Sequence, residues 1–381
     1  MTEAGKTNFN FPVGYHRFHK NQLFNYQLNR PYAFGYAEYE DLRWAGSRIS
    51  DFATWKSEMT ACAEKALSEG RLINAAFYYR AAEFYTSSQD PDKERLYDTF
   101  SELFYSAIAG DPLEKASVPY GNVSLPAIKL APAAVSKGTI VLHGGFDSFI
   151  EELYSMMRYF SDHGYEVIGF EGPGQGAALK KHGLALDYKW EKPVKAVLDY
   201  FDRDDVTLIG ISMGGYFCLR AAAFESRVKR VIADGHAIDY WKIPPPVAQW
   251  LMKFFYTHLR DYTNRSMEKA LKKGSMESWT IANLMYIAKL SRPIEVLDFS
   301  MQLNENNLHS ELVKQDVLLL SSEGDHFIPI KMHGKQVRAL INARSVTDRI
   351  FRKNEDAHNH CQIGNVGLAL EVMRTWIDSM T

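Results

Sequence analysis

Residues 208–215 carry the types and spacing that indicate chemistry most directly. They read Leu-Ile-Gly-Ile-Ser-Met-Gly-Gly, so that Ser212 stands between Gly210 and Gly214 in a Gly-x-Ser-x-Gly pattern. An apolar strand run precedes the pattern, and an apolar, alanine-rich run compatible with a helix follows it. In such a strand-to-helix turn the glycines make room for the crowded backbone, and the serine is presented as a nucleophile. We predict Ser212 as the nucleophile; the alternative is that its hydroxyl merely caps the next helix.

A serine hydroxyl reacts well only when a base removes its proton and a carboxylate orients that base. Asp325 comes just after the carboxyl end of an apolar strand run. Ligands of parallel sheets bind at the carboxyl ends of the strands. Asp234, at the end of the strand run after Ser212, is a second candidate for the acid. Two candidates for the base, His358 and His360, precede the last helical run. On these residues we prefer Asp325 and His360, and the alternatives stay open.

The oxyanion that develops during acyl transfer needs fixed N–H donors. These are usually the backbone N–H after the nucleophile and another from a loop after an earlier strand. Met213 supplies the first N–H. A Gly-Gly-Phe-Asp sequence follows an apolar strand run, and we predict Phe146 as the second donor, with Gly145 as the alternative. The next residues, Ser148 and Glu151, match a capping box at the start of a helix.

Residues 171–177, Glu-Gly-Pro-Gly-Gln-Gly-Ala, contain a Gly-x-Gly-x-x-Ala pattern that is similar to a dinucleotide fingerprint. A true fingerprint follows the first strand of the sheet and has an acidic residue at a second strand end roughly 20 positions later. Neither condition is met, so we interpret the segment as a tight loop near the active-site edge. His358, His360 and Cys361 are suitable metal ligands, but they lack a partner cluster of defined spacing. We therefore expect no cofactor and no metal.

Short apolar runs and helical runs alternate through most of the chain after residue 113. Gly121 and Asn122 fit a two-residue hairpin turn between the first two runs. The alternation predicts an α/β fold with a mostly parallel sheet and helices on both faces. The predicted strands are 114–120, 123–130, 139–143, 166–170, 206–209, 228–233 and 317–321.

The regions outside this alternation are helical. Residues 55–67 and 72–85 predict an antiparallel helix pair that is broken at Gly70. The interval from Ser212 to Asp325 is longer than two strand-helix-strand units require, at roughly 30 residues each. We predict that the excess is a helical lid, although a surface helix pair without substrate contact is the alternative. The predicted parts are a helical N-terminal domain at 1–112, an α/β core at 113–239 and 312–381, and a lid insertion at 240–311.

Composition narrows the function classes. The chain has 381 residues, of which 46% are hydrophobic and 24% charged, and its formal net charge is −2. A near-neutral chain of this kind has no electrostatic field that would attract nucleic acid or anionic lipid. No apolar run approaches the roughly 18 residues of a membrane span, and the N-terminus is too polar for a signal peptide. The three cysteines fit reduced thiols, so we expect a cytoplasmic protein.

The motifs together resemble the α/β-hydrolase superfamily, in which the triad residues follow the order Ser, Asp, His. More narrowly, they resemble the group that contains 2,6-dihydropseudooxynicotine hydrolase, fungal polyketide-shortening hydrolases, and acylaminoacyl-peptidase-like or dipeptidyl-aminopeptidase-like serine hydrolases. The matching motifs are Gly144-Gly145-Phe146-Asp147 with Glu151-Glu152, Phe170-Glu171-Gly172-Pro173-Gly174-Gln175-Gly176, Gly210-Ile211-Ser212-Met213-Gly214-Gly215, Gly324-Asp325, and His360-Cys361-Gln362. The resemblance covers most of the chain, including the helical segment 70–85.

The His-Cys-Gln match implies that His360, and not His358, is the base. The long 240–310 insertion departs from the nicotine-degrading member, so we do not transfer that enzyme's substrate. The sequence thus predicts a serine hydrolase that cleaves a small ester, amide or aminoacyl-peptide through Ser212, His360 and Asp325. The alternatives are a hydrolase of carbon–carbon bonds in ketones or diketones, and a non-catalytic binding module on the same fold. We expect a small-molecule or short-peptide substrate and neither nucleic acid nor membrane as a partner; a homodimer is left open.

Overall fold

The computed structural model describes residues 7–380, which divide into two compact units. One unit consists of the chain up to Leu113 together with Arg352–Val372. The other consists of Glu114–Phe351 together with the residues from Met373 onward. No helix among the described residues is long and apolar enough to cross a membrane.

The first unit is built around five helices. Trp55 is fully buried, stacks on Phe24 at 5.2 Å between ring centroids and meets Tyr85 edge to face at 5.0 Å. The predicted helix pair is confirmed, because Gly70 adopts a φ of 73° between two long helices. The helices are α1 (Gln22–Ala33), α2 (Tyr39–Gly46), α3 (Phe52–Ser68), α4 (Leu72–Tyr85) and α5 (Asp92–Ala107). The short 3-10 helices η4 (Lys353–Glu355) and η5 (His360–Gln362) belong to the same unit.

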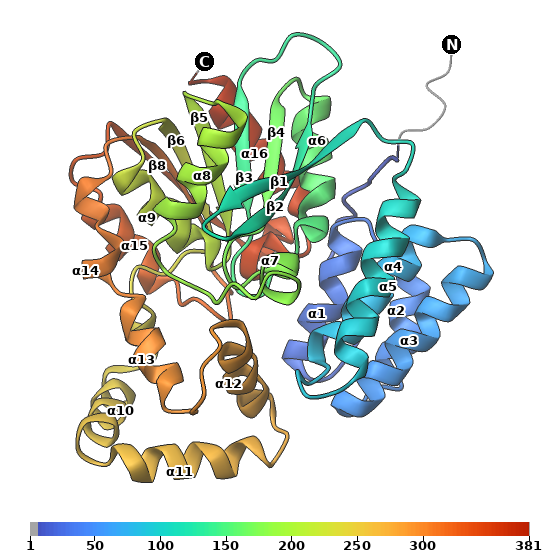
Figure 1. Cartoon of the computed structure of the whole chain (residues 1–381), viewed down its shortest axis with the longest axis vertical. Helices are drawn as coiled ribbons and strands as arrows, with labels where there is room; N and C mark the ends of the chain where they lie inside the picture. The colour runs from blue at the N-terminus through green and yellow to red at the C-terminus, as the bar shows by residue number, and fades with distance from the viewer. Residues whose placement is uncertain (1–6, 381) are drawn as a thin grey trace. The chain divides into compact units, whose positions relative to one another are not determined.

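The second unit contains an eight-stranded sheet with the order β1-β2-β4-β3-β5-β6-β7-β8 (Figure 1). β2 is antiparallel to β4, and all pairs from β4 to β8 are parallel. This confirms the predicted α/β class. The strands are β1 (Leu113–Tyr120), β2 (Val123–Leu130), β3 (Thr139–His143), β4 (Glu166–Phe170), β5 (Val206–Ile211), β6 (Val228–Asp234), β7 (Asp316–Ser322) and β8 (Ser345–Phe351).

Helices cover both faces of this sheet. Ile168 and Phe170 of β4 pack into a core cluster with residues of α8 (Glu191–Phe201) and α9 (Gly214–Phe224). Gly169 points to the opposite face, because successive strand residues alternate, and the sulfur of Met157 in α6 (Tyr154–Asp162) lies against it. The remaining helices of the sheet region are η1 (Ile150–Leu153), α7 (Gly176–Lys180), α15 (Lys331–Ala339) and α16 (Val366–Asp378), of which α16 spans the boundary between the units.

A helical insertion separates β6 from β7, as the length of that interval predicts. Figure 1 shows α10 to α13 in yellow and orange, projecting from one end of the sheet. The insertion is tied to the sheet region, since Tyr216 Oη donates to the carbonyl oxygen of Asn304 at 3.0 Å. Its elements are η2 (Tyr240–Lys242), α10 (Pro246–His258), α11 (Arg260–Leu271), α12 (Met276–Ile287), α13 (Glu295–Gln302), α14 (Glu305–Leu308) and η3 (Ser310–Leu312).

Candidate active site

Ser212 stands in a sharp turn between β5 and α9. Its φ of 62° is in the left-handed region, which non-glycine residues rarely occupy, and such strain is frequent at functional sites. The Ser212 N–H donates to the carbonyl oxygen of Asp234 at 2.7 Å, so the neighbouring strand β6 holds the turn in place. The turn is therefore built as the sequence pattern predicts.

The glycines around Ser212 are required by space. A Cβ atom at Gly210 would overlap the carbonyl oxygen of Gly214. A Cβ atom at Gly214 would lie 2.7 Å from the carbonyl oxygen of Gly144, in the loop after β3. The backbone of the strand end therefore lies against the start of α9, and the start of α9 lies against this loop. No residue larger than glycine fits at either position.

The loop after β3 lies directly against the N–H groups at the start of α9. A Cβ atom at Gly145 would lie 2.5 Å from the nitrogen of Met213 and 2.7 Å from that of Gly214. The Gly145 N–H is already occupied, because it donates to Ser148 Oγ at 3.1 Å. This bond leaves Phe146 as the candidate for the second oxyanion donor, and that assignment stays a prediction.

The predicted capping box of Ser148 and Glu151 is wrong. The residue that caps η1 is Glu152, whose Oε2 accepts the N–H of Phe149 at 3.0 Å. Ser148 instead closes a turn within the loop by accepting the N–H of Gly145. The serine hydroxyl therefore shapes the candidate oxyanion loop.

Gln175 holds the same loop from behind. Its Nε2 donates to the carbonyl oxygens of Gly144 and Gly145, each at 2.8 Å, and its Oε1 accepts the N–H of Gly172 at 2.9 Å. The side chain is 1% exposed, so water does not compete for these bonds. Each of these carbonyl groups shares a peptide plane with the N–H of the next residue. By fixing both carbonyl groups, Gln175 therefore also fixes the N–H groups of Gly145 and Phe146. The sequence predicts a tight loop here but not this role.

We expect Gln175→Ala to lower kcat roughly 10- to 100-fold, somewhat less than the loss of one oxyanion donor itself. The two carbonyl groups would lose their buried donor, which costs about 1–3 kcal/mol of stability and releases the loop. Steady-state kinetics with a thermal unfolding curve measures both effects. Gln315→Ala is the matched control, since Gln315 is also buried and donates to a carbonyl oxygen, that of Ala222, at 2.8 Å. An equal fall in kcat for both variants would contradict the positioning role.

Glu171 anchors the start of the loop that contains Gln175. Its carboxyl group accepts the N–H groups of Ile150 at 3.1 Å and of Ala177 at 2.6 Å. Burial, and then the neighbouring Glu151, raise the pKa of Glu171 to about 8. A Cβ atom at Gly176 would overlap the carboxyl group, which accounts for the glycine. Glu171 thus ties η1 and α7 together beneath the candidate oxyanion loop.

Both candidates for the acid lie in the unit that contains Ser212. Asp325 follows β7, and its Oδ1 accepts the N–H groups of Phe327 at 2.8 Å and Ile328 at 2.9 Å. These bonds fix the carboxylate in a tight turn. Asp234 ends β6, is 2% exposed and pairs in register with Ile211 of β5. Both residues therefore stand at the carboxyl edge of the sheet, and the choice of Asp325 stays a prediction.

Two other histidines lie beside the turn that holds Ser212, and neither suits a general base. Burial lowers the pKa of His143 to about 4 and the pKa of His236 to about 3. A general base works best when its pKa is near the operating pH. His143 Nδ1 donates to the carbonyl oxygen of Gly144 at 3.0 Å, which is a structural contact. Among the described residues, no group of three or more His, Cys, Asp or Glu side chains is arranged to hold a metal ion.

His360 and His358 belong to the other compact unit. His360 is buried, and its carbonyl oxygen accepts the hydroxyl of Tyr26 at 3.2 Å. The two residues after it have left-handed backbone, with φ values of 49° at Cys361 and 51° at Gln362. His358 is half-buried. The assignment of His360 as the base stays a prediction.

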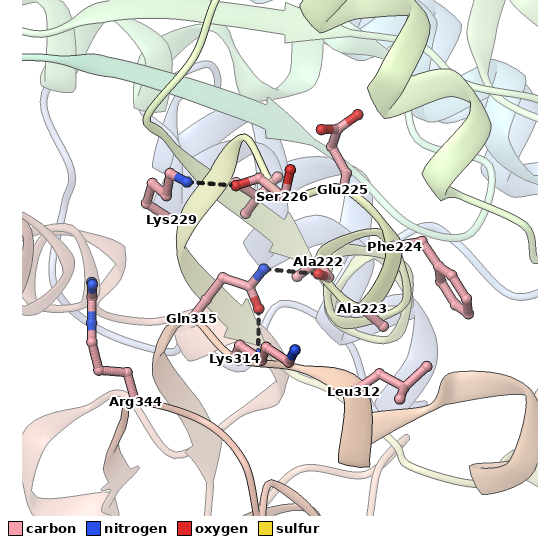
Figure 2. A pocket seen from close by; sticks show the side chains of 11 residues that line it. Ala222, Ala223, Phe224, Glu225, Ser226, Lys229, Leu312, Lys314, Gln315 and Arg344 are labelled. Atoms are coloured by element: carbon pink, nitrogen blue, oxygen red, sulfur yellow. Dashed lines mark hydrogen bonds between the residues drawn. The ribbon is translucent and has the colours of Figure 1, made fainter.

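A separate hollow of about 440 Å³ lies at the amino ends of β6, β7 and β8 (Figure 2). It is lined by residues of the α9 end, such as Phe224, and by Lys229, Gln315 and Arg344. The carboxyl ends of the strands, where Ser212 stands, are at the opposite edge. Because ligands of parallel sheets bind at the carboxyl edge, this hollow is not the candidate active site.

The chain matches the family model of the alpha/beta hydrolase fold over residues 140–353, which is more than half of its length. Among curated relatives, the hydrolyase poxO of Penicillium oxalicum is 26% identical, over 95% of this chain and 98% of its own. The 20-hydroxy-prefusarin hydrolase FUS2 of Gibberella moniliformis is 25% identical, over 96% of this chain and 98% of its own.

Solved structures have the same fold. The 2,6-dihydroxy-pseudo-oxynicotine hydrolase superposes with a TM-score of 0.66 at 21% identity, and the match covers 92% of this chain and 94% of that chain. AbyA5 superposes with a TM-score of 0.67 at 16% identity, covering 90% of each chain. The resemblance inferred from the motifs is thus confirmed for the superfamily. The chain belongs to the α/β-hydrolase family and is a hydrolase of that fold.

Proposed function

We propose that the chain is a serine hydrolase that cleaves a small substrate through Ser212, His360 and Asp325. The observation that carries the proposal is the strained Ser212 turn, with the Gly145 loop packed against the nitrogens of Met213 and Gly214. A non-glycine residue in the left-handed region is uncommon, and such residues concentrate at functional sites. A strained serine turn and a loop packed against the N–H groups that follow it are the arrangement expected of a nucleophile beside an oxyanion site.

In this mechanism His360 accepts the proton of Ser212 Oγ while the oxygen attacks the substrate carbonyl carbon. The N–H groups of Met213 and Phe146 bind the oxyanion of the tetrahedral intermediate. His360 then protonates the leaving group, and an acyl-enzyme forms on Ser212. Water, deprotonated by His360, releases the acyl group by the same steps. In the proposed triad Asp325 is the acid that orients His360, and its Oδ1 is held by the N–H groups of Phe327 and Ile328.

The insertion supports the proposal that substrates are small. Asn283 of α12 donates through Nδ2 to Asp147 Oδ2 at 2.7 Å, and both side chains are buried. Asp147 follows Phe146 directly and has a φ of 46°. The helical insertion is therefore bonded to the candidate oxyanion loop, as a lid over the reaction site requires. The relative named for a single compound, 20-hydroxy-prefusarin, also supports a single small compound as the substrate.

We expect Asn283→Ala to lower kcat about 10-fold, because Asp147 would lose a buried partner worth roughly 1–3 kcal/mol and the loop would loosen. Asn283→Asp should lower it further, since two carboxylates would then face each other in a buried site. Kinetics on any substrate identified for the wild type measures this. The control is Asn264→Ala, which removes a buried contact within the insertion, to the N–H of Ile294 at 3.1 Å. Equal effects of Asn264→Ala and Asn283→Ala would contradict the coupling.

A substrate panel tests the proposed class. Purified protein is incubated with short-chain esters, aminoacyl amides and β-diketones, and product formation is followed by mass spectrometry. Turnover of an ester or amide supports acyl transfer, whereas turnover of a β-diketone alone replaces it with cleavage of a carbon–carbon bond. Lack of turnover together with lack of fluorophosphonate labelling would overturn the serine hydrolase and favour a binding module.

A further inference from the structure

The helix α10 is apolar except on one narrow side, where Gln249, Lys253 and Thr257 lie one turn apart. None of its residues, all of which the structure describes, is buried. One side is half-buried, with Ala248, Met252 and Tyr256, and Tyr256 Oη donates to Asp298 Oδ1 of α13 at 2.5 Å. An apolar side of a helix is normally packed against another element. The outer side of α10 therefore lacks the cover that its composition calls for.

The outer side forms a continuous apolar stripe. Val247, Trp250, Leu251, Phe254 and Phe255 follow the spacing i, i+3, i+4, i+7, i+8, which places them on one helix face. Trp250 is 65% exposed and stacks on Phe254, with 5.9 Å between ring centroids. No Lys, Arg, Asp or Glu interrupts this stripe.

The stripe continues onto α11. Phe255 stacks on Tyr262 at 6.5 Å between ring centroids, and Tyr262 is 57% exposed. Leu251, Phe255, Tyr262 and Leu297 line a hollow of about 330 Å³ between α10, α11 and α13. We refer to the exposed residues as the α10 patch. It consists of Val247, Trp250, Leu251, Phe254, Phe255, Leu259 and Tyr262.

The area of the α10 patch matches a protein interface. Large aromatic side chains carry about 150–250 Å² each, so the exposed part of the patch amounts to roughly 700 Å². A soluble monomer rarely exposes an apolar patch of more than about 300–600 Å². A standard interface buries about 800 Å² on each partner. The patch is thus large enough to be the centre of one.

The charges near the α10 patch favour a protein over a lipid surface. The exposed charged residues of α10 and α11 include both signs: Lys253, Arg265 and Lys269 are basic, and Asp261 and Glu268 are acidic. A mixed polar rim around an apolar centre is the usual anatomy of a protein interface. A helix that lies on an anionic membrane is rich in Lys and Arg on its polar side, whereas α10 has a single such residue, Lys253.

We propose that the α10 patch binds the same patch of a second copy of the chain, as a two-fold symmetric homodimer. In an isologous pair each residue near the axis meets its own copy. Trp250 and Phe254 stand at the centre of the stripe, so α10 crosses its symmetry mate there. Apolar stripes complement themselves, and because the rim has charges of both signs, Lys253 and Arg265 can meet acids of the other copy. The proposal is independent of the proposed reaction.

Light scattering after size-exclusion chromatography tests the dimer over a hundredfold range of loading concentration. We expect the wild type to have the mass of two chains and Trp250→Glu/Phe254→Glu the mass of one. Ile341→Glu is the matched control: Ile341 is 73% exposed but lies outside the patch, and this variant should stay dimeric. A monomeric wild type overturns the proposal, whether or not the protein binds phosphatidylcholine–phosphatidylserine vesicles. A dimeric double variant overturns it as well.

A crosslink keeps the test decisive if the charged variant fails to fold. Phe254→Cys should form a disulfide with its own copy under mild oxidation and run as a dimer on a non-reducing gel. The native cysteines, Cys62, Cys218 and Cys361, are all buried and add little background. Ile341→Cys should stay monomeric on the same gel. If neither Phe254→Cys nor Trp250→Cys crosslinks beyond the Ile341→Cys control, the α10 patch is not at a two-fold axis and the proposal fails.

Discussion

Ser212→Ala should abolish turnover, with kcat lower by on the order of 10⁴- to 10⁶-fold, because the members of a triad act as a unit. The protein should remain folded. The Ser212 N–H bond to Asp234 is a backbone bond, and alanine retains it. The φ of 62° at this position is strained for serine and alanine alike, so the substitution adds no backbone strain. The measurement is kcat together with a thermal unfolding curve.

Labelling locates the nucleophile without knowledge of the substrate. A fluorophosphonate should modify the wild type once, at Ser212, and peptide mass spectrometry identifies the site. Ser148→Ala is the matched control, since this serine lies in the candidate oxyanion loop and should affect the labelling rate but not its site. An adduct on a different serine, or full labelling of Ser212→Ala, would exclude Ser212 as the nucleophile.

Much of the sheet follows from the sequence, because its inner strands are buried on both faces and read as uninterrupted apolar runs. β3 and β4 have the predicted bounds, and every residue of β5 is buried. β8 is missing from the predicted strands for the opposite reason. It is an edge strand whose middle residues, Thr347 and Asp348, are exposed, and Phe351 is its only buried residue. Apolar runs cannot reveal such a strand.

The candidate site was predictable where a backbone turn demands special residues. Gly210 and Gly214 indicate the Ser212 turn in the sequence, because larger residues do not fit at these two positions. The roles of Gln175 and Asn283 were not predictable, since each depends on a contact between segments far apart in the chain. A glutamine in a glycine-rich loop has many possible partners. Only the fold brings it to the carbonyl groups behind the candidate oxyanion loop.

His360→Ala should lower kcat on the order of 10⁴- to 10⁶-fold, as for the nucleophile, because a serine without its base is not activated. His358→Ala should retain activity within a few fold. The two residues differ in their surroundings. His360 is buried and begins a turn in which Cys361 and Gln362 both have left-handed backbone, whereas His358 is half-buried. Strain of this kind persists only where the surroundings hold it, and it concentrates at functional sites.

The rate of fluorophosphonate labelling separates a missing base from a damaged fold. Without its base, Ser212 should label very slowly in His360→Ala although the unfolding temperature is close to that of the wild type. Tyr26→Phe is the matched control for packing, since it removes only the 3.2 Å hydrogen bond to the His360 carbonyl oxygen and should leave labelling nearly unchanged. If His358→Ala lost labelling while His360→Ala kept it, the two assignments would have to be exchanged. If both variants labelled at the wild-type rate, the base would have to lie elsewhere. The buried His143 and His236, with pKa values lowered to about 4 and about 3, are poorly suited to replace it.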